Sequence, residues 1–551
     1  MPTRREALSQ LLAAGLALPA VRAWPRLRAV GAPPLALPTP AQLDWQDLEL
    51  GMFVHFAPNT WQDKEYDDLS SAPADIMPAV DTAQWAETAL ALGARYIVLV
   101  AKHTGGFCLW QTDTTDYSIR STPWRGGHGD VMADLATVCA QRGLRLGVYL
   151  SPRDDRHGAG LSGRCATPEA QAAYDELYRR QLTELLTRYG PIVELWLDGS
   201  SVVPTGDLVA RHAPNAMVFQ GPQATIRWVG NEDGFAPYPC WNGIAATDAK
   251  TGIATALHGD PSGDVWMPVE VDVSIRRPNW FWSTTNAAHL VSLDDLVEIY
   301  YRSVGRGTQL LLNLPPDRTG RIPEADASRA KQFGDEIRRR FGAPLGQTGG
   351  SGRSMVLSFE RPTRVDHVVL EEALNRGERV RAWKLEGYAW DHWQPLGEGY
   401  AIGHKRIFPV RPDGYTMLRL TVTRSEGEAV LRRFAAYDAG VAPPRTWRDT
   451  VQLWADDAVG SWSGDTLSLD LSGKAATAGR YRLRLVSESG DPVELRDLEL
   501  SVAGQPASQL AHDAPGRQDA VLLSIPLSNS HVALKARLRG AARGTVLLQR
   551  W

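Results

Sequence analysis

The feature that most constrains the fold is an alternation of short apolar segments with helical segments along residues 45–343. The apolar segments are bounded by turn residues, as buried parallel strands are. They are residues 52–56, 96–101, 144–150, 193–197, 217–219 and 310–314. The helical patterns between them are residues 83–92, 131–142, 168–188, 293–304 and 324–340. Asp81 and Thr167, just before two of these helices, are favourable helix N-caps.

Repeated β–α units predict a parallel sheet, either closed into a barrel or open. No phosphate-binding glycine loop follows the first strand, which weakens the open, dinucleotide-binding alternative. We therefore expect an α/β fold, a (β/α)8 TIM-type barrel over residues 45–345.

The pattern changes after residue 345. GQTGGSGRS has the composition of a linker, and short alternating segments separated by turn residues follow it. This indicates a C-terminal β-sandwich. Because 200 residues is long for one sandwich, we place a second boundary in APPRTW, residues 442–447. The expected order is a sandwich over residues 346–442 and a second β-rich domain over 443–551.

Residues 1–23 have the form of a bacterial signal peptide. Arg4 and Arg5 precede a short apolar run that ends in small residues. The arginine pair is similar to a twin-arginine export signal, and the run is too short to span a bilayer. A linker rich in Pro and Ala is expected over residues 24–44. We expect an exported protein, periplasmic or extracellular, without a membrane span.

Composition narrows the choice of partner. Lys and Arg number 59 and Asp and Glu 63, so the net charge of −4 gives no general attraction to nucleic acid.

The four cysteines have spacings that suit neither a zinc site nor a disulfide framework. We therefore expect free thiols, with a single disulfide as the alternative. The 19 tryptophans suit large cores or platforms for sugars.

Chemically active side chains follow the ends of the predicted barrel strands, where barrel enzymes build their sites. They include His55, Glu65, Tyr66, His103, Trp196, Asp198, Arg227, Asn231, Glu232, Glu270 and Asp272. Carboxylates among aromatic residues suit glycoside hydrolysis, in which one carboxyl group attacks the anomeric carbon and the other protonates the leaving oxygen.

The chain resembles glycoside hydrolase family 29, the α-L-fucosidases. The matching stretches, in order, are MFVHF, NTWQDKEY, YIVLVAKHTGGFCLWQTDTTDYS, RGLRLGVYLSP, RYGPIVELWLDG, RWVGNE and LLLNLPPDRTGRIP. The resemblance implies a (β/α)8 barrel followed by a β-sandwich, a retaining mechanism, and no metal or other cofactor.

Roles follow from the resemblance by position. Asp198 of WLDG matches the nucleophile. Glu232 of RWVGNE matches the acid/base of the branch that prefers α-1,3/1,4-linked fucose, with Glu270 as runner-up. Substrate-binding residues implied by the motifs are His55, Glu65, Tyr66, His103, Thr104, Trp196, Arg227 and Asn231. In KHTGGF, Thr104 and Gly105 stand where the family usually has His and Asp.

The expected function is that of a retaining exo-α-L-fucosidase that releases terminal fucose from oligosaccharides or glycoprotein glycans. The altered KHTGGF segment keeps two alternatives open: hydrolysis of a different sugar, and a barrel that binds glycan without turnover. Scattered tryptophans after residue 345 fit either sandwich cores or glycan platforms.

Overall fold

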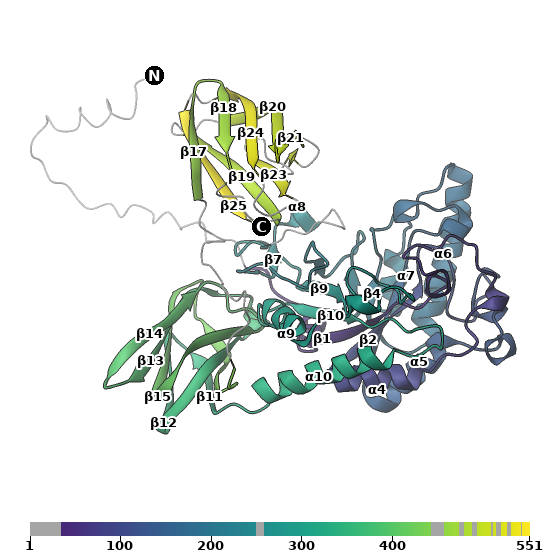
Figure 1. Cartoon of the computed structure of the whole chain (residues 1–551), viewed down its shortest axis with the longest axis horizontal. Coiled ribbons are helices and arrows are strands. Elements are labelled where there is room, and N and C mark those ends of the chain that lie inside the picture. The colour runs from purple at the N-terminus through teal and green to yellow at the C-terminus, as the bar shows by residue number, and fades with distance from the viewer. Residues whose placement is uncertain are drawn as a thin grey trace, which may run out of the picture. The chain divides into compact units, whose positions relative to one another are not determined.

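A computed structural model describes residues 35–249, 258–441, 457–472, 479–487, 493–507, 511–513, 520–525, 531–540 and 543–550 (Figure 1). The expected signal peptide and the expected boundary at residues 442–447 lie outside this range. None of the helices in the described part is both long and apolar enough to cross a membrane.

Eight parallel strands form the predicted barrel, and they neighbour one another in chain order. They are β1 Leu50–Val54, β2 Tyr96–Lys102, β3 Arg145–Leu150, β4 Ile192–Trp196, β5 Met217–Phe219, β6 Arg227–Trp228, β9 Val269–Ser274 and β10 Gln309–Asn313. The β5 and β6 strands meet only through an isolated bridge between Phe219 and Ile226. Inward-facing side chains such as Phe53, Tyr96 and Leu311 fill the barrel as one buried cluster.

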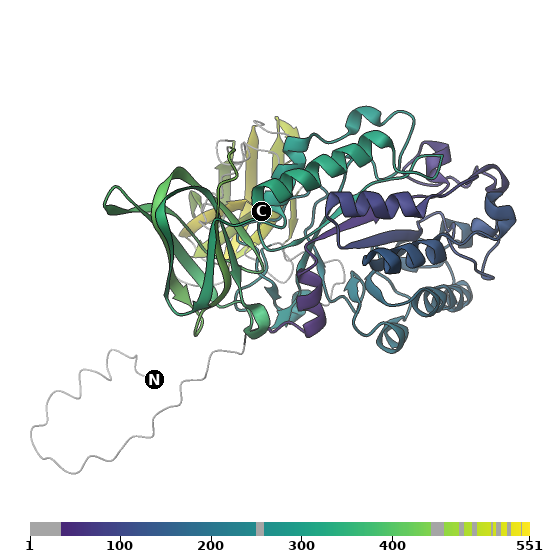
Figure 2. The same cartoon turned by 90° about the horizontal axis from the view of Figure 1, so that it is seen from below.

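Helices lie around the outside of the strands (Figures 1 and 2). They are α3 Asn59–Gln62, α4 Thr82–Leu92, α5 Val131–Arg142, α6 Pro168–Arg188, α7 Gly206–His212, α9 Leu293–Arg302 and α10 Glu324–Phe341. Asp81 and Thr167 cap α4 and α6 as predicted, because each side chain accepts a backbone N–H of the first turn. Residues 220–226 contain no helix; after β6 the chain forms a small hairpin, β7 Gly243–Ile244 and β8 Val265–Trp266, and the short α8 Ala246–Ala249.

The expected linker over residues 24–44 was wrong for its last part, because Pro40–Gln46 forms helix α2. Thr39 and Gln42 form a reciprocal capping box, which satisfies backbone N–H groups that a linker would leave to water. Trp45 is buried, and its indole N–H donates to Glu194 Oε2 inside the barrel at 2.6 Å. The helix is therefore part of the barrel.

Residues 346–437 form a six-stranded antiparallel sheet. Its strands are β11 Gly346–Ser351, β12 Ser354–Glu372, β13 Val380–Ala389, β14 His392–Gly399, β15 Arg406–Ser425 and β16 Val430–Tyr437. One half of the β12–β15 pair continues into β16 and β11, and the other half into β13 and β14, so the two long strands serve both layers of a sandwich. The expected linker GQTGGSGRS was also wrong: residues 346–351 are edge strand β11, whose backbone pairs with β16 without needing apolar side chains.

The last region is β-rich, as expected. A five-stranded sheet and a four-stranded sheet share one core that includes Trp462, Leu483 and Leu534. The strands are β17 Asp457–Ser463, β18 Thr466–Asp470, β19 Gly479–Ser487, β20 Val493–Val502, β21 Gln505–Pro506, β22 Ala511–Asp513, β23 Ala520–Ile525, β24 Val532–Gly540 and β25 Arg543–Arg550. The fold is an α/β barrel followed by β-sandwich structure.

Candidate active site

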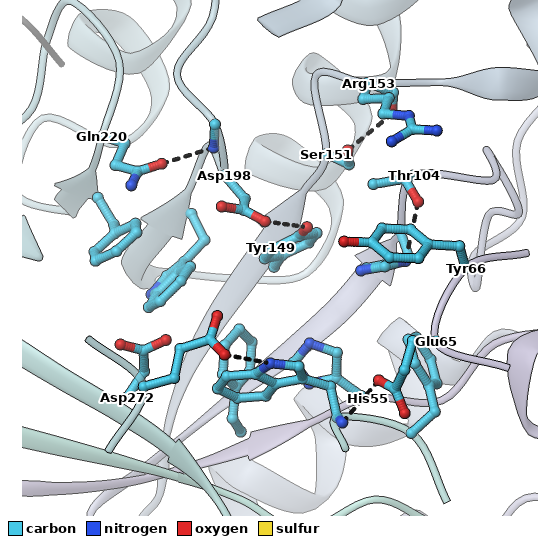
Figure 3. Close-up of a pocket in the computed structure, with 18 of the residues that line it drawn as sticks. His55, Glu65, Tyr66, Thr104, Tyr149, Ser151, Arg153, Asp198, Gln220 and Asp272 are labelled. Carbon is cyan, nitrogen blue, oxygen red and sulfur yellow. Dashed lines mark hydrogen bonds between the residues drawn. The ribbon is translucent and has the colours of Figure 1, made fainter. Parts of the chain in front are cut away.

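A cavity of about 420 Å³ opens at the carboxyl ends of the barrel strands (Figure 3). Eight of the predicted site residues line it: His55, Glu65, Tyr66, His103, Thr104, Trp196, Asp198 and Glu232. The cavity also has an aromatic wall that includes Tyr149, Trp228, Trp280 and Phe281. A concave site with aromatic walls and many polar groups suits a small polar ligand with apolar faces.

Asp198 follows β4 and faces the cavity from its floor. The Tyr149 hydroxyl donates to Asp198 Oδ2 at 3.0 Å, and Gln220 Oε1 accepts the backbone N–H of Gly199 at 2.7 Å (Figure 3). Burial raises the pKa of the Asp198 carboxyl group, and the Tyr149 hydrogen bond opposes this rise by stabilising the carboxylate. Asp198 therefore lines the cavity with its carboxyl group held in place by Tyr149.

Glu232 lies on the loop after β6, and the Trp280 indole N–H donates to its Oε2 at 3.3 Å. Burial raises the pKa of Glu232, while Trp280 and the positive charge of Arg277 oppose this rise. The negative charge of Asp198 acts in the same direction as burial, so the two carboxyl groups influence each other's ionisation. A carboxyl group in this environment keeps its proton to a higher pH than an exposed one.

Asp272, in β9, is a further carboxyl group that lines the cavity. The Trp228 indole N–H donates to its Oδ1 at 2.6 Å. Burial raises the pKa of Asp272 to about 8, and the charges of Glu232 and Asp198 add to this effect. At neutral pH the cavity therefore holds one carboxyl group that is largely neutral and can donate a hydrogen bond.

Glu270, the runner-up acid, does not line the cavity. It precedes Asp272 by two residues and points into the same barrel interior, one layer deeper, where the Tyr96 hydroxyl donates to it at 3.2 Å. Burial and the charge of Glu194 hold the pKa of Glu270 well above its usual range. The Glu194 carboxylate accepts the indole N–H groups of Trp45 and Trp196, both at 2.6 Å. Glu194 and Glu270 are therefore buried below the cavity and do not line it.

Two histidines form one side of the cavity. Asn313 Oδ1 lies 2.8 Å from His55 Nδ1, and the His103 ring stacks on Tyr149 with ring centres 5.9 Å apart. Burial lowers the pKa of His55 well below its usual range and that of His103 to about 3. Both rings are therefore neutral at physiological pH and each offers one donor and one acceptor.

The loop after β1 presents Glu65 and Tyr66 to the cavity. The Glu65 carboxylate accepts the Asn279 side-chain N–H and the Trp280 backbone N–H, both at 2.9 Å. Tyr66 is 63% exposed, and the Arg153 guanidinium, held by both oxygens of Asp155, lies 5.7 Å from its ring centre. This loop is fixed on one side and leaves an aromatic face open at the cavity mouth.

Gly105 has no room for a side chain. A Cβ atom at this position would lie 2.3 Å from Asp67 Oδ2 and 2.5 Å from Asp67 Cβ. Asp67 is 5% exposed and accepts the Tyr117 hydroxyl at 2.6 Å, the Gln62 amide at 2.7 Å and the Leu69 backbone N–H at 2.8 Å. Asp67 thus occupies the space that a side chain at residue 105 would need.

Two expected substrate-binding residues lie outside the cavity. Arg227 is buried, and its guanidinium donates to the backbone carbonyls of Met267 and Trp241. The Asn231 side chain donates to the Phe235 carbonyl and accepts the Asp233 N–H, which closes a turn. Strand alternation explains the first error: Trp228, next to Arg227, is the residue of β6 that faces inward.

Tyr149 was missed by the sequence reasoning. It stands two residues before Ser151, which follows β3, and both line the cavity. Alternation along β3 from Ser151 would have found it. Within the described residues, no group of three or more His, Cys, Asp or Glu side chains is arranged to hold a metal ion.

Comparison with known proteins agrees with this geometry. A sequence model of the α-L-fucosidase family matches residues 76–339. The chain is 37% identical over 358 residues to α-L-fucosidase 1 of Arabidopsis thaliana, covering 62% of this chain and 69% of that one. It is 33% identical over 458 residues to a relative from Oryza sativa subsp. japonica that also carries an α-L-fucosidase 1 name, covering 74% and 86%.

Solved structures extend the comparison. A glycoside hydrolase family 29 member from an unknown rumen bacterium superposes with a TM-score of 0.67 at 28% identity, covering 94% of this chain and 100% of that one. A Ruminococcus gnavus fucosidase of the same family, solved in complex with fucose, superposes with a TM-score of 0.66 at 26% identity, covering 74% and 97%. The chain belongs to the α-L-fucosidases of glycoside hydrolase family 29.

Proposed function

We propose that this protein is a retaining exo-α-L-fucosidase in which Asp198 is the nucleophile and Glu232 the acid/base, acting on terminal α-1,3- or α-1,4-linked fucose. One observation carries the proposal. Asp198 and Glu232 line the same cavity from the segments after β4 and β6, each receives a hydrogen bond from an aromatic side chain, and the charge of Asp198 helps to raise the pKa of Glu232. Glu270, by contrast, is buried and does not line the cavity.

In the first step the Asp198 carboxylate attacks the anomeric carbon, while Glu232 transfers its proton to the leaving glycosidic oxygen. The bond to the leaving group breaks, and a covalent fucosyl-enzyme forms on Asp198. The raised pKa of Glu232 keeps the proton available, and the Tyr149 hydrogen bond favours the anionic form of Asp198. Burial raises the pKa of both carboxyl groups, and at Asp198 the hydrogen bonds from the Tyr149 hydroxyl and the Gly199 N–H oppose that rise and stabilise the carboxylate that the attack requires.

In the second step Glu232, now a carboxylate, takes a proton from water, and the water oxygen attacks the anomeric carbon. Asp198 leaves, and fucose is released with its original configuration. Neutral His55 and His103, the anchored Glu65 and the neutral Asp272 offer fixed donors and acceptors for the sugar hydroxyl groups. Trp196, stacked on Phe219, and Trp280 offer faces for its apolar side.

The linkage preference is supported by the space beyond Glu232. A second hollow of about 540 Å³ shares Pro278 with the cavity and is lined by Asp233, Arg277, His289 and neighbours. Such space next to the acid can hold a branched leaving group, as α-1,3- and α-1,4-linked fucose requires. We also propose that the protein is exported, to the periplasm or outside the cell, on the signal-like pattern of residues 1–23. N-terminal sequencing of the mature protein from each cell fraction tests this.

The proposed function is tested by fucose release from a panel of α-1,2-, α-1,3-, α-1,4- and α-1,6-fucosylated oligosaccharides. Wild type should release fucose mainly from the α-1,3 and α-1,4 members, and proton NMR of the first product should show the α-anomer. Asp198→Ala and Glu232→Ala should both lose release, whereas Glu270→Gln, the matched buried-carboxyl control, should keep it. A first product in the β-form contradicts the retaining mechanism. If Glu232→Ala stays active, Glu232 is not the acid, and Asp272→Asn and Glu65→Gln then test the two other carboxyl groups that line the cavity.

A further inference from the structure

Trp390 has the most exposed large hydrophobic side chain in the described part of the chain, at 78%. It lies at the tip of the β13–β14 hairpin of the first sandwich, where Ala389 pairs with His392 and leaves Trp390 and Asp391 as a two-residue turn. The tryptophan inside β13 differs: Trp383 is 1% exposed and belongs to the sandwich core. The fold therefore uses one tryptophan for packing and leaves the other in solvent.

The turn itself is unusual for its residues. Trp390 has a backbone φ of 55° and Asp391 one of 61°, so both are left-handed. A turn of this kind favours Asn–Gly, and a bulky side chain at its first position is disfavoured. Neither the backbone conformation nor the exposure of Trp390 helps this hairpin to fold. Both features keep a large flat ring at the hairpin tip.

The ring borders a hollow of about 530 Å³ that is separate from the catalytic cavity. Its lining is Trp390, His392, Trp393, Gln394, Pro395, Arg411 and Asp413. The indole N–H of Trp390 donates to Asp413 Oδ2 at 3.4 Å, and Arg411 contacts both Asp413 and Gln394. The second indole, Trp393, is held by the Arg419 guanidinium at 4.0 Å from its ring centre. The hollow thus has two tethered aromatic side chains and several planar polar groups.

We propose that this hollow is a second carbohydrate site, which binds a neutral oligosaccharide. Trp390 would stack on the apolar face of a pyranose ring, and Asp413, Gln394 and His392 would bond its hydroxyl groups. An anionic ligand fits less well, because the Arg411 charge is already paired with Asp413. The choice of a glycan rests on the proposed function, since a second sugar site holds a fucosidase close to its substrate and raises the local concentration of cleavable ends.

The test uses the full chain and isothermal titration with a tetrasaccharide of galactose, N-acetylglucosamine and glucose that carries no fucose. We expect wild type to bind with millimolar affinity. Trp390→Asn should weaken binding about tenfold or more, because tryptophan platforms dominate such contacts. Asn also suits the left-handed turn, so this variant should fold. Trp390→Tyr, which keeps an aromatic ring, should stay within about threefold of wild type.

Val356→Ala is the matched control, because Val356 is 45% exposed on β12 of the same sandwich but lies outside the hollow. It should leave binding unchanged. All three variants should hydrolyse a small aryl α-L-fucoside as wild type does, so a failure of the proposed function shows in this assay and not in the titration. Equal binding by wild type and Trp390→Asn overturns the proposal. So does an absence of binding at about 10 mM tetrasaccharide, or a dimer that only Trp390→Asn dissociates.

Discussion

Adding a single methyl group at Gly105 should disturb the loop that carries Glu65 and Tyr66. In Gly105→Ala the new Cβ would lie 2.5 Å from Asp67 Cβ, whereas carbon atoms normally approach to about 3.5–4.0 Å. Asp67 must therefore move by about 1 Å. Its carboxylate cannot do so and keep all three of its hydrogen bonds, to Tyr117, Gln62 and Leu69. The substitution therefore displaces Asp67, a buried side chain that fixes the loop carrying Glu65 and Tyr66.

The size of the effect follows from the bonds lost. A buried hydrogen-bonding group left without a partner costs about 1–3 kcal/mol, and the Tyr117 hydroxyl, on a side chain that is 5% exposed, loses its acceptor when Asp67 moves. We expect Gly105→Ala to lower the free energy of unfolding by about 1–3 kcal/mol. Because Glu65 and Tyr66 immediately precede Asp67, KM for an aryl fucoside should rise more than kcat falls.

A swap sharpens the test. Gly105→Asp alone should be at least as harmful as Gly105→Ala, but Gly105→Asp combined with Asp67→Gly returns one carboxyl group to the same space from the other loop. Scanning calorimetry of the barrel transition and steady-state kinetics give both readouts. The double variant should recover part of the stability and of the KM. The reasoning fails if Gly105→Ala matches wild type in both, or if the double variant is worse than the sum of the single ones.

Three further predictions concern charged groups. Tyr149→Phe removes a hydrogen bond that lowers the pKa of Asp198, so the acid limb of the kcat/KM profile should move to higher pH and kcat/KM should fall about tenfold or more. An unchanged acid limb would mean that Asp198 is not the ionising nucleophile. Asp272→Asn mimics the protonated carboxyl group. Because the pKa of Asp272 is about 8 in the folded state and lower in the unfolded state, ionisation of wild type costs folding free energy that grows as the pH rises to 8. The melting temperature of the variant should therefore exceed that of wild type by more at pH 9 than at pH 5. Lys102 and Asp154 form an ion pair in which both side chains are 0% exposed. In a urea titration Lys102→Met should lower the unfolding free energy by about 3–5 kcal/mol, because it leaves the Asp154 charge buried without its partner. Lys102→Met combined with Asp154→Leu should lower it by less, because no unpaired charge remains.

The sequence predicted six of the eight barrel strands, because these six are continuous apolar runs bounded by turn residues. Strands β6 and β9 were not predicted, since β6 has only two residues and β9 alternates apolar residues with Glu270 and Asp272. Strands β2 and β5 and helices α5 and α6 begin at the expected residues. The segments at residues 40–46 and 346–351 could not be predicted in this way. Helix α2 is stabilised by a capping box and by Trp45 inside the barrel, and β11 by pairing with β16, both of which are long-range or geometric effects.

The candidate site divides in a similar way. Asp198, Glu232, the histidines and the Glu65–Tyr66 segment were found because they follow strand ends in motifs. Arg227 and Asn231 stand in the same kind of motif, but a motif does not tell which side of a strand a side chain faces or whether it closes a turn. Glu270 shows a third limit, since depth within a barrel depends on layers formed by several strands at once.

The junction between β5 and β6 has a consequence for stereochemistry. Asp198 belongs to the wall before this junction and Glu232 to the wall after it, and a single bridge replaces the ladder found between the other strands. In glycosidases a gap of about 5–5.5 Å between the two carboxyl groups gives retention, and about 6.5–9.5 Å gives inversion. The distance that selects the outcome is thus set across the least reinforced joint of the barrel, where a small insertion would widen it without disturbing the remaining strands.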